Sequence, residues 1–146
     1  MNFLLSSIVF VSGLFGLDAF AAGPANSPNA PLVCPLRLKK AQMCLAYQWL
    51  QPLKTRAPLS LELRFAGPLN DGEKAVPVEP IDKPYVFLLM PSMGHGSPMQ
   101  PRIEKSGPGT YRVHNLLFSM PGEWEIHFQL RQGAMIVDEV LVPVQL

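Results

Sequence analysis

The sequence contains few of the residues on which most catalytic and metal sites depend. Of its 146 residues, two are cysteine and three are histidine. The two cysteines are not spaced like a zinc-ribbon pair, and no phosphate-binding loop occurs. The stretch GHGS at 94–97 does not match G-x-S-x-G, and the chain offers no helix of the kind that must follow a nucleophile elbow. We therefore predict that the protein is not an enzyme.

An excess of charge of either sign is also missing. The chain has 12 Lys and Arg residues against 11 Asp and Glu residues, a formal net charge of +1. Proteins that bind nucleic acid or anionic membranes usually carry a clear basic surface. This balance favours neither kind of partner, and we predict no nucleic-acid binding.

The N-terminal apolar run, from Phe3 to Leu17, is too short for a confident membrane span, which needs about 20 apolar residues. It is followed by AFAAG, whose small residues are typical of a signal-peptidase site. We predict a secretory signal peptide over residues 1–22 and a periplasmic or otherwise secreted location. Membrane contact is expected only if the signal stays uncleaved. The remaining length of about 124 residues predicts a single domain.

After export, Cys34 and Cys44 would meet an oxidising compartment, where an even number of cysteines favours a disulfide. A loop this short predicts a stabilisation of about 2 to 3 kcal/mol. The alternative is that both are thiolate metal ligands. We predict the disulfide, because two free thiols in an oxidising space tend to pair.

The chain also lacks any long apolar pattern with a helical period, and it holds 16 prolines, which break helices and are tolerated in turns and at strand edges. Instead, short runs alternate in hydrophobicity between Pro/Gly turns, which indicates strands. We predict a flexible lead-in over 23–41 and an all-β domain over 42–146, a single immunoglobulin-like antiparallel β-sandwich of about seven strands. The predicted strands are Gln42–Leu50, Leu59–Phe65, Pro84–Met90, Pro101–Lys105, Thr110–Phe118, Glu123–Arg131 and Met135–Leu146.

The strongest local signal is MPSMGHGSPM, residues 90–99, which gathers soft donors in a stretch broken by Gly, Pro and Ser. Thioether sulfur and imidazole nitrogen favour cuprous copper over hard cations. Methionine binds without losing a proton and cannot be consumed by disulfide formation. The motif therefore predicts Met93, His95 and Met99 as copper ligands.

The order of strands and loops along the chain predicts a fourth ligand. If consecutive strands are antiparallel, every second loop lies at the same end of the sandwich, so the loops Pro91–Gln100 and Ser119–Gly122 share an end. Met120 then comes near His95 as a further ligand.

Other roles for these side chains stay open. Met90 ends an apolar strand and is more readily a core residue than a ligand, since methionine fills irregular gaps. Met120 can equally be a loop residue tucked over the mouth of the sandwich. His114 and His127 lie within strands, and we expect both on a solvated face.

The stretch MPSMGHGS, followed by GPGTYRVHNLLFSMPGEWEIHFQL, resembles the YtkA-like family of bacterial extracytoplasmic domains, which is related in pattern to the FixH proteins of cytochrome oxidase assembly. The resemblance covers roughly Leu45 to Leu130. It implies an immunoglobulin-like fold and a role in copper handling, with Met93, His95, Met99 and Met120 as the positions carried over. FixH proteins keep a membrane anchor, whereas this chain has the pattern of a cleavable signal. Cys34 and Cys44 lie outside the family pattern.

These observations predict a periplasmic copper-binding protein that serves trafficking or buffering through a Met/His loop at one end of a sandwich. Its partner would be a copper donor or acceptor. The alternative is a metal-free periplasmic interaction module, for example an assembly factor for a membrane complex, because methionine-rich surfaces bind adaptably.

Overall fold

The computed structural model describes residues 34–67 and 76–146. The predicted signal peptide and residues 23–33 of the predicted lead-in lie outside this part of the chain. Within the described residues there is no helix of the length and hydropathy needed to cross a membrane. The strands are β1 (Leu36–Leu38), β2 (Met43–Trp49), β3 (Leu59–Ala66), β4 (Lys83–Met90), β5 (His95–Gly96), β6 (Arg102–Gly107), β7 (Thr110–Leu116), β8 (Glu123–Gln132) and β9 (Met135–Gln145).

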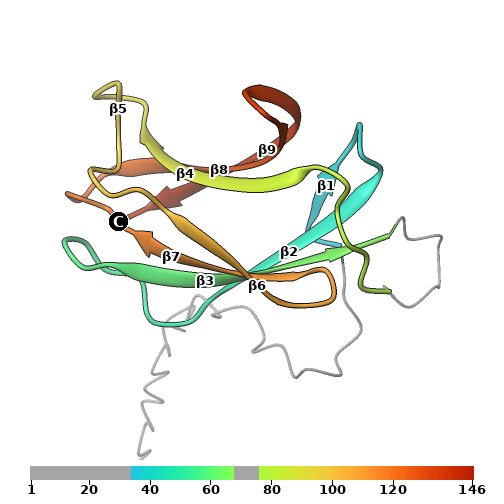
Figure 1. Cartoon of the computed structure of the whole chain (residues 1–146). Helices are drawn as coiled ribbons and strands as arrows, with labels where there is room; N and C mark the ends of the chain where they lie inside the picture. Colours follow the sequence, from blue (N-terminus) through green and yellow to red (C-terminus); the bar gives the residue numbers. More distant parts are fainter. Residues whose placement is uncertain (1–33, 68–75) are drawn as a thin grey trace, which may run out of the picture. The chain divides into compact units, whose positions relative to one another are not determined.

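These strands form two antiparallel sheets, in the orders β1-β2-β3-β7-β6 and β5-β4-β8-β9 (Figure 1). The predicted all-β sandwich is confirmed, and each of the seven predicted strands overlaps an observed one. The structure adds β1 and β5. Because β1 pairs with β2, the prediction of a flexible lead-in is wrong at Leu36–Leu38.

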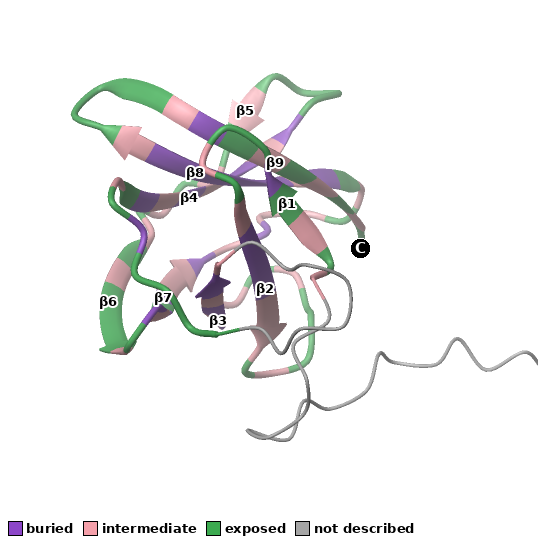
Figure 2. Ribbon diagram, turned by 90° about the vertical axis from the view of Figure 1, so that its right-hand side faces the viewer, coloured by how far each residue is buried: buried purple, intermediate pink, exposed green. Residues whose placement is uncertain are grey.

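The core lies between the sheets because apolar residues alternate along their strands. Along β3, Leu59, Leu61, Leu63 and Phe65 are buried while the residues between them are partly exposed. Figure 2 shows buried residues running along β2, β3 and β8, each of which lies between two other strands of its sheet. The alternation of apolar residues in the sequence therefore determines which face of each strand packs into the core.

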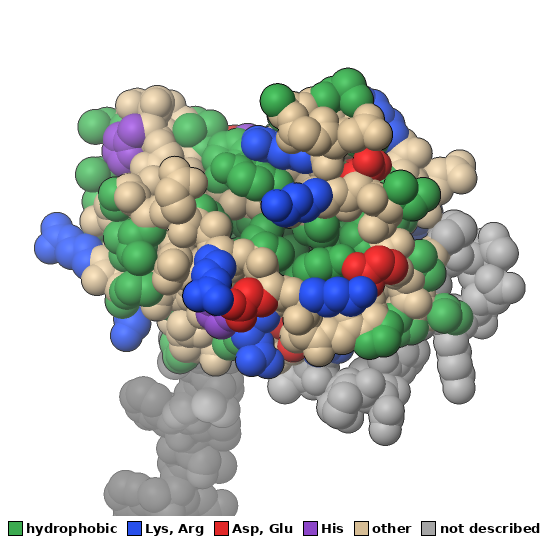
Figure 3. Space-filling view, in the orientation of Figure 1, with side chains coloured by type: hydrophobic (Ala, Val, Ile, Leu, Met, Phe, Trp, Pro, Cys, Tyr) green, Lys and Arg blue, Asp and Glu red, His purple; other side chains and the backbone are tan. Residues whose placement is uncertain are grey.

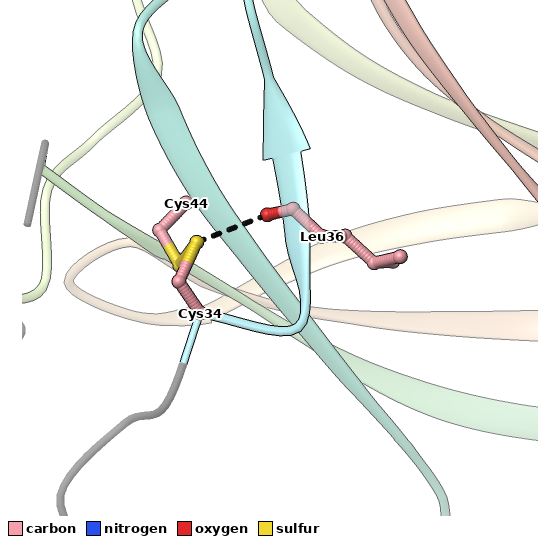
Figure 4. Close-up of a disulfide and its surroundings, with 3 residues drawn as sticks. All are labelled: Cys34, Leu36 and Cys44. Atoms are coloured by element: carbon pink, nitrogen blue, oxygen red, sulfur yellow. Dashed lines mark hydrogen bonds between the residues drawn. A yellow bond between two sulfur atoms is a disulfide. The ribbon is translucent and has the colours of Figure 1, made fainter.

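A disulfide joins Cys34 to Cys44, with 5.4 Å between their Cα atoms, as predicted (Figure 4). Cys44 is buried within β2, so the bond fixes the start of β1 to the second strand of the sheet. Cys34 Sγ lies 3.2 Å from the Leu36 carbonyl oxygen, a contact in which the bonded sulfur, having no hydrogen, donates nothing. The disulfide and the pairing with β2 together explain why a strand forms where the sequence predicted a lead-in.

The carboxylate of Glu79 links the segment before β4 to the β6–β7 hairpin. Glu79 accepts hydrogen bonds from the Gly109 amide at 3.1 Å and from the Tyr111 hydroxyl, and Lys105 Nζ lies 2.9 Å away. The hydrogen bond from Tyr111, followed by those from Lys105 and Gly109, lowers the pKa of Glu79 to about 2. Burial, followed by the Glu79 carboxylate, raises the pKa of Tyr111.

We expect this carboxylate to make stability depend on acid pH. The folded-state pKa of about 2 lies below the ordinary value of 4.5, so the contribution is complete above that value and disappears as pH falls through about 2. Unfolding midpoints of the wild type and of Glu79→Gln, measured across this range, should converge at low pH. Glu104→Gln removes an exposed carboxylate of β6 as the control; a gap between wild type and Glu79→Gln that stays constant down to pH 2 would contradict the assignment.

Candidate metal site

The predicted copper loop begins as a tight β4–β5 hairpin. The Gly94 amide donates to the Met90 carbonyl at 3.0 Å, and the Met93 amide donates to the same oxygen at 3.2 Å. Gly94 has φ of 63°, a left-handed conformation that glycine adopts without strain. The turn brings His95 into register opposite Met90, so the two side chains lie on the same face of the sheet.

The turn between β7 and β8 lies against this hairpin. A Cβ added at Gly122 would be 2.5 Å from the Met90 methyl carbon, which places the end of the Met90 side chain directly over Gly122. The expectation that the two loops share one end of the sandwich is therefore confirmed. The backbone allows this close approach because Gly122, with φ of 139°, has no side chain.

Trp124 joins the two loops through its ring. Its Nε1–H donates to the Met120 carbonyl oxygen at 3.0 Å. Its ring lies edge-on to the imidazole of His95, with 5.9 Å between ring centroids. Trp124 is only 1% exposed, so the surrounding core holds its ring in place. We call Met90, His95, Met120 and Trp124 the tip cluster.

The hydrogen bonding of His95 leaves one nitrogen suited to a metal. Its Nδ1 lies 3.1 Å from the Gly96 carbonyl oxygen. Because a carbonyl oxygen only accepts, this contact favours the tautomer with the proton on Nδ1. Nε2 then keeps its lone pair, as metal-binding histidines do when a carbonyl holds the other ring nitrogen. His95 Nε2 could therefore donate to a metal ion.

The predicted ligands differ in their surroundings. Met120 is partly buried and packs against the core, as does Met90, which is buried. Met93 stands in the turn with 60% of its surface exposed. Met99 lines a separate hollow beside Tyr85 and Phe87. Trp124 thus contacts the His95 ring and the Met120 backbone carbonyl, and the Met90 side chain lies over Gly122. The assignment of these residues as ligands stays a prediction.

Sequence reasoning missed a polar network on the outer face of the sheet β5-β4-β8-β9. We expected His127 on a solvated face, but its side chain is buried. Its Nδ1 lies 2.9 Å from a Glu139 carboxylate oxygen and its Nε2 3.2 Å from one of Glu125. Its ring stacks on Phe87 with 4.2 Å between centroids. Alternation along β8 correctly gave its outward direction, but only the pairing with β4 and β9 supplies the residues that cover it.

The same network holds Glu139 as a carboxylate. Burial alone would raise the pKa of Glu139, but hydrogen bonds from Gln129 and His127 outweigh it and lower the pKa. His114, by contrast, is partly exposed, and its Nδ1 lies 3.0 Å from the Ser60 hydroxyl. In the described ranges, no three His, Cys, Asp or Glu side chains form a group that could hold a metal ion.

The fold and its tip define a small all-β sandwich domain with thioether and imidazole groups at one end. Residues 61–129 match the model of the YtkA-like family, the family that the motif resembles. The match includes every predicted copper ligand and excludes the disulfide. No curated protein and no solved structure shows a significant match to the chain.

Proposed function

We propose that this YtkA-like domain is a periplasmic copper-binding protein that carries or buffers cuprous copper at the tip cluster. The observation that supports the proposal most is that two loops distant in sequence contact the same indole ring, one through the His95 imidazole and the other through the Met120 backbone carbonyl. His95 Nε2 and the Met120 sulfur would be the inner ligands. Met93 and Met99 would approach from the loop, and Met90 is a fifth candidate.

The position of the cluster suits transfer of the ion. His95 is partly exposed and Met93 is exposed in the adjoining turn, so a partner protein can reach the donors without opening the core. Methionine and histidine form bonds to copper that exchange readily, since neither ligand is a thiolate. The cargo would therefore be held loosely enough to pass to an acceptor with stronger ligands.

Competition titration of the protein with Cu(I), using a chromophoric chelator, tests the proposal. We expect His95→Ala and Met120→Leu each to weaken binding by more than about tenfold, since even loss of an outer-shell partner costs that much. Met93→Leu, Met99→Leu and Met90→Leu, measured singly, decide which further thioethers are ligands.

Two controls are available within the chain. Met135→Leu changes an exposed methionine at the start of β9, next to the turn at the far end of β8, and His114→Gln changes a histidine of the other sheet. Both should bind as the wild type does. A wild-type protein that binds no Cu(I) would overturn the proposal and favour the metal-free interaction module, in which the exposed Met93 contacts a partner protein.

A further inference from the structure

One side of the end of the sandwich that holds the tip cluster is positive. The loop between β2 and β3, residues 50–58, carries Lys54 and Arg56, both exposed, and contains no Asp or Glu. Within residues 34–67 and 76–146, neither cation takes part in an ion pair. We call this segment the basic loop. Figure 3 shows Lys and Arg side chains that project beside hydrophobic ones at the left end of the molecule, where the basic loop lies in Figure 1.

The basic loop is joined to the segment that leads into the tip cluster. The Arg56 amide donates to the Phe118 carbonyl oxygen at 2.8 Å, and Met120 follows two residues later in the chain. Leu50 and Leu53 of the same loop are 45% and 39% exposed. A partner that rests on this loop would therefore meet apolar surface as well as positive charge, next to the turn that carries Met120.

The other side of this end is negative. A hollow of about 420 Å³, distinct from the one that Met99 lines, contains no Lys or Arg in its lining, which includes Pro91, Glu123, Glu125, Pro143 and Gln145. We call it the acidic hollow. The two glutamates alternate along β8 with the buried Trp124 and Ile126, so they point to the outer face of their sheet. The hollow therefore lies on the sheet opposite the basic loop.

Glu123 carries the charge of the acidic hollow. Glu125 already contacts His127 at 3.2 Å, whereas Glu123 is exposed and forms no ion pair with any residue that the structure describes. The β7–β8 turn links the two charged surfaces, because Phe118 before it holds the basic loop and Glu123 after it lines the hollow. Met120 lies between these two residues in the chain, so part of the tip cluster stands between a positive and a negative surface.

A surface that carries both signs restricts the kind of partner. A nucleic acid or an anionic membrane is negative throughout, so the acidic hollow would oppose whatever the basic loop attracts. A protein can present an acidic and a basic group side by side, and such complementarity determines the orientation in which two proteins meet. The division of charge therefore favours a protein partner.

We propose that this end of the sandwich docks a partner protein of opposite polarity, with acidic side chains over the basic loop and a Lys or Arg side chain in the acidic hollow. Leu50 and Leu53 would supply apolar contact beside the acidic side chains. The alkyl part of the basic side chain would pack against Pro91 and Pro143. That this partner gives or accepts copper rests on the proposed function, whereas the docking itself does not depend on a bound ion.

Two acetylated, amidated pentapeptides test the two surfaces, one of alternating glutamate and leucine and one of alternating arginine and alanine. Each is added to the whole metal-free protein and followed by amide NMR. We expect the acidic peptide to shift the amides of the basic loop and the basic peptide to shift those of Glu123 and Gln145.

Charge-neutral variants should act on one peptide each. Lys54→Gln combined with Arg56→Gln should weaken binding of the acidic peptide by about fivefold and leave the basic peptide unaffected. Glu123→Gln should weaken binding of the basic peptide by about two- to fivefold and leave the acidic peptide unaffected. Each variant is thus the control for the other. A single peptide that joins both sequences through a flexible glycine–serine linker should bind at least about tenfold more tightly than either half.

Several results would overturn the proposal. Shifts of the same amides by both peptides, or no shifts at millimolar peptide, would contradict the division of charge. A linked peptide that binds no more tightly than its better half would show that the two surfaces do not serve one partner. Cosedimentation of the wild type with phosphatidylglycerol vesicles, lost in the Lys54→Gln and Arg56→Gln double variant, would assign the basic loop to a membrane. Shifts of both surfaces on raising the protein concentration alone would show that a second copy of the chain is the occupant. Because both titrations use metal-free protein, failure of copper binding would leave this test unaffected.

Discussion

Replacing Trp124 with alanine is expected to lower the free energy of unfolding by about 3 to 5 kcal/mol, the usual cost of removing a buried aromatic side chain. Trp124 is 1% exposed. Its ring packs against Phe118, with 5.5 Å between centroids, and its Nε1–H satisfies the Met120 carbonyl. Alanine would leave a cavity and an unpaired acceptor where the two loops meet. Denaturant unfolding of the metal-free protein measures the loss directly.

Trp124→Phe separates the two contributions. It keeps an aromatic ring but removes the hydrogen bond to Met120, so we expect a smaller loss of about 1 to 2 kcal/mol. Trp49→Ala is a matched comparison at a partly buried tryptophan that packs against the same core, and it should cost less than Trp124→Ala. A Trp124→Ala protein as stable as the Trp49→Ala protein would show that Trp124 does not support the tip.

Gly109→Ala is expected to lower the free energy of unfolding by about 2 to 4 kcal/mol, because two penalties act together. Gly109 has φ of 57°, which an L side chain rarely adopts. A Cβ there would also lie 2.7 Å from the Val78 carbonyl oxygen and 2.8 Å from that of Phe65. Both obstacles are backbone atoms, so neither can rotate away. The turn would have to shift and would strain the contacts that Glu79 makes with it.

Gly133→Ala is the control for the conformational penalty alone. Gly133 has nearly the same φ, 61°, but a Cβ there would meet nothing within 4 Å. We expect its loss to be about 1 kcal/mol. Thermal or denaturant unfolding of the two variants gives the difference, which measures the crowding at Gly109. Equal losses for the two variants would contradict the close packing of the segment Val76–Glu79 on the β6–β7 turn.

The sequence predicted the sandwich well where one face of a strand is buried. Leu59–Phe65 was predicted and Leu59–Ala66 is observed, because burial of alternate side chains leaves a period of two in the sequence. The two-residue β5 was not predicted, since two residues cannot show a period. β1 was missed because its three residues are too few to show a period. They form a strand through pairing with β2.

The candidate site was predicted less completely. The alternation of loops between the two ends of the sandwich predicted Met120 at the same end as His95, and the structure agrees. Yet Met93, His95 and Met99, close neighbours in the sequence, have different surroundings: the first is exposed, the second touches Trp124, and the third lines the hollow beside β4. The direction of a side chain in a turn depends on the backbone dihedral angles of that turn, which the motif does not specify.

The sequence by itself determined the all-β class, the disulfide and the end of the sandwich where the soft donors lie. These follow from residue type, alternation and order along the chain, which are local properties. Only the tertiary structure decided that Trp124 connects the two loops and that His127 is buried between two carboxylates. Each of these depends on strand order and register, because residues far apart in the chain become neighbours only when the sheets assemble.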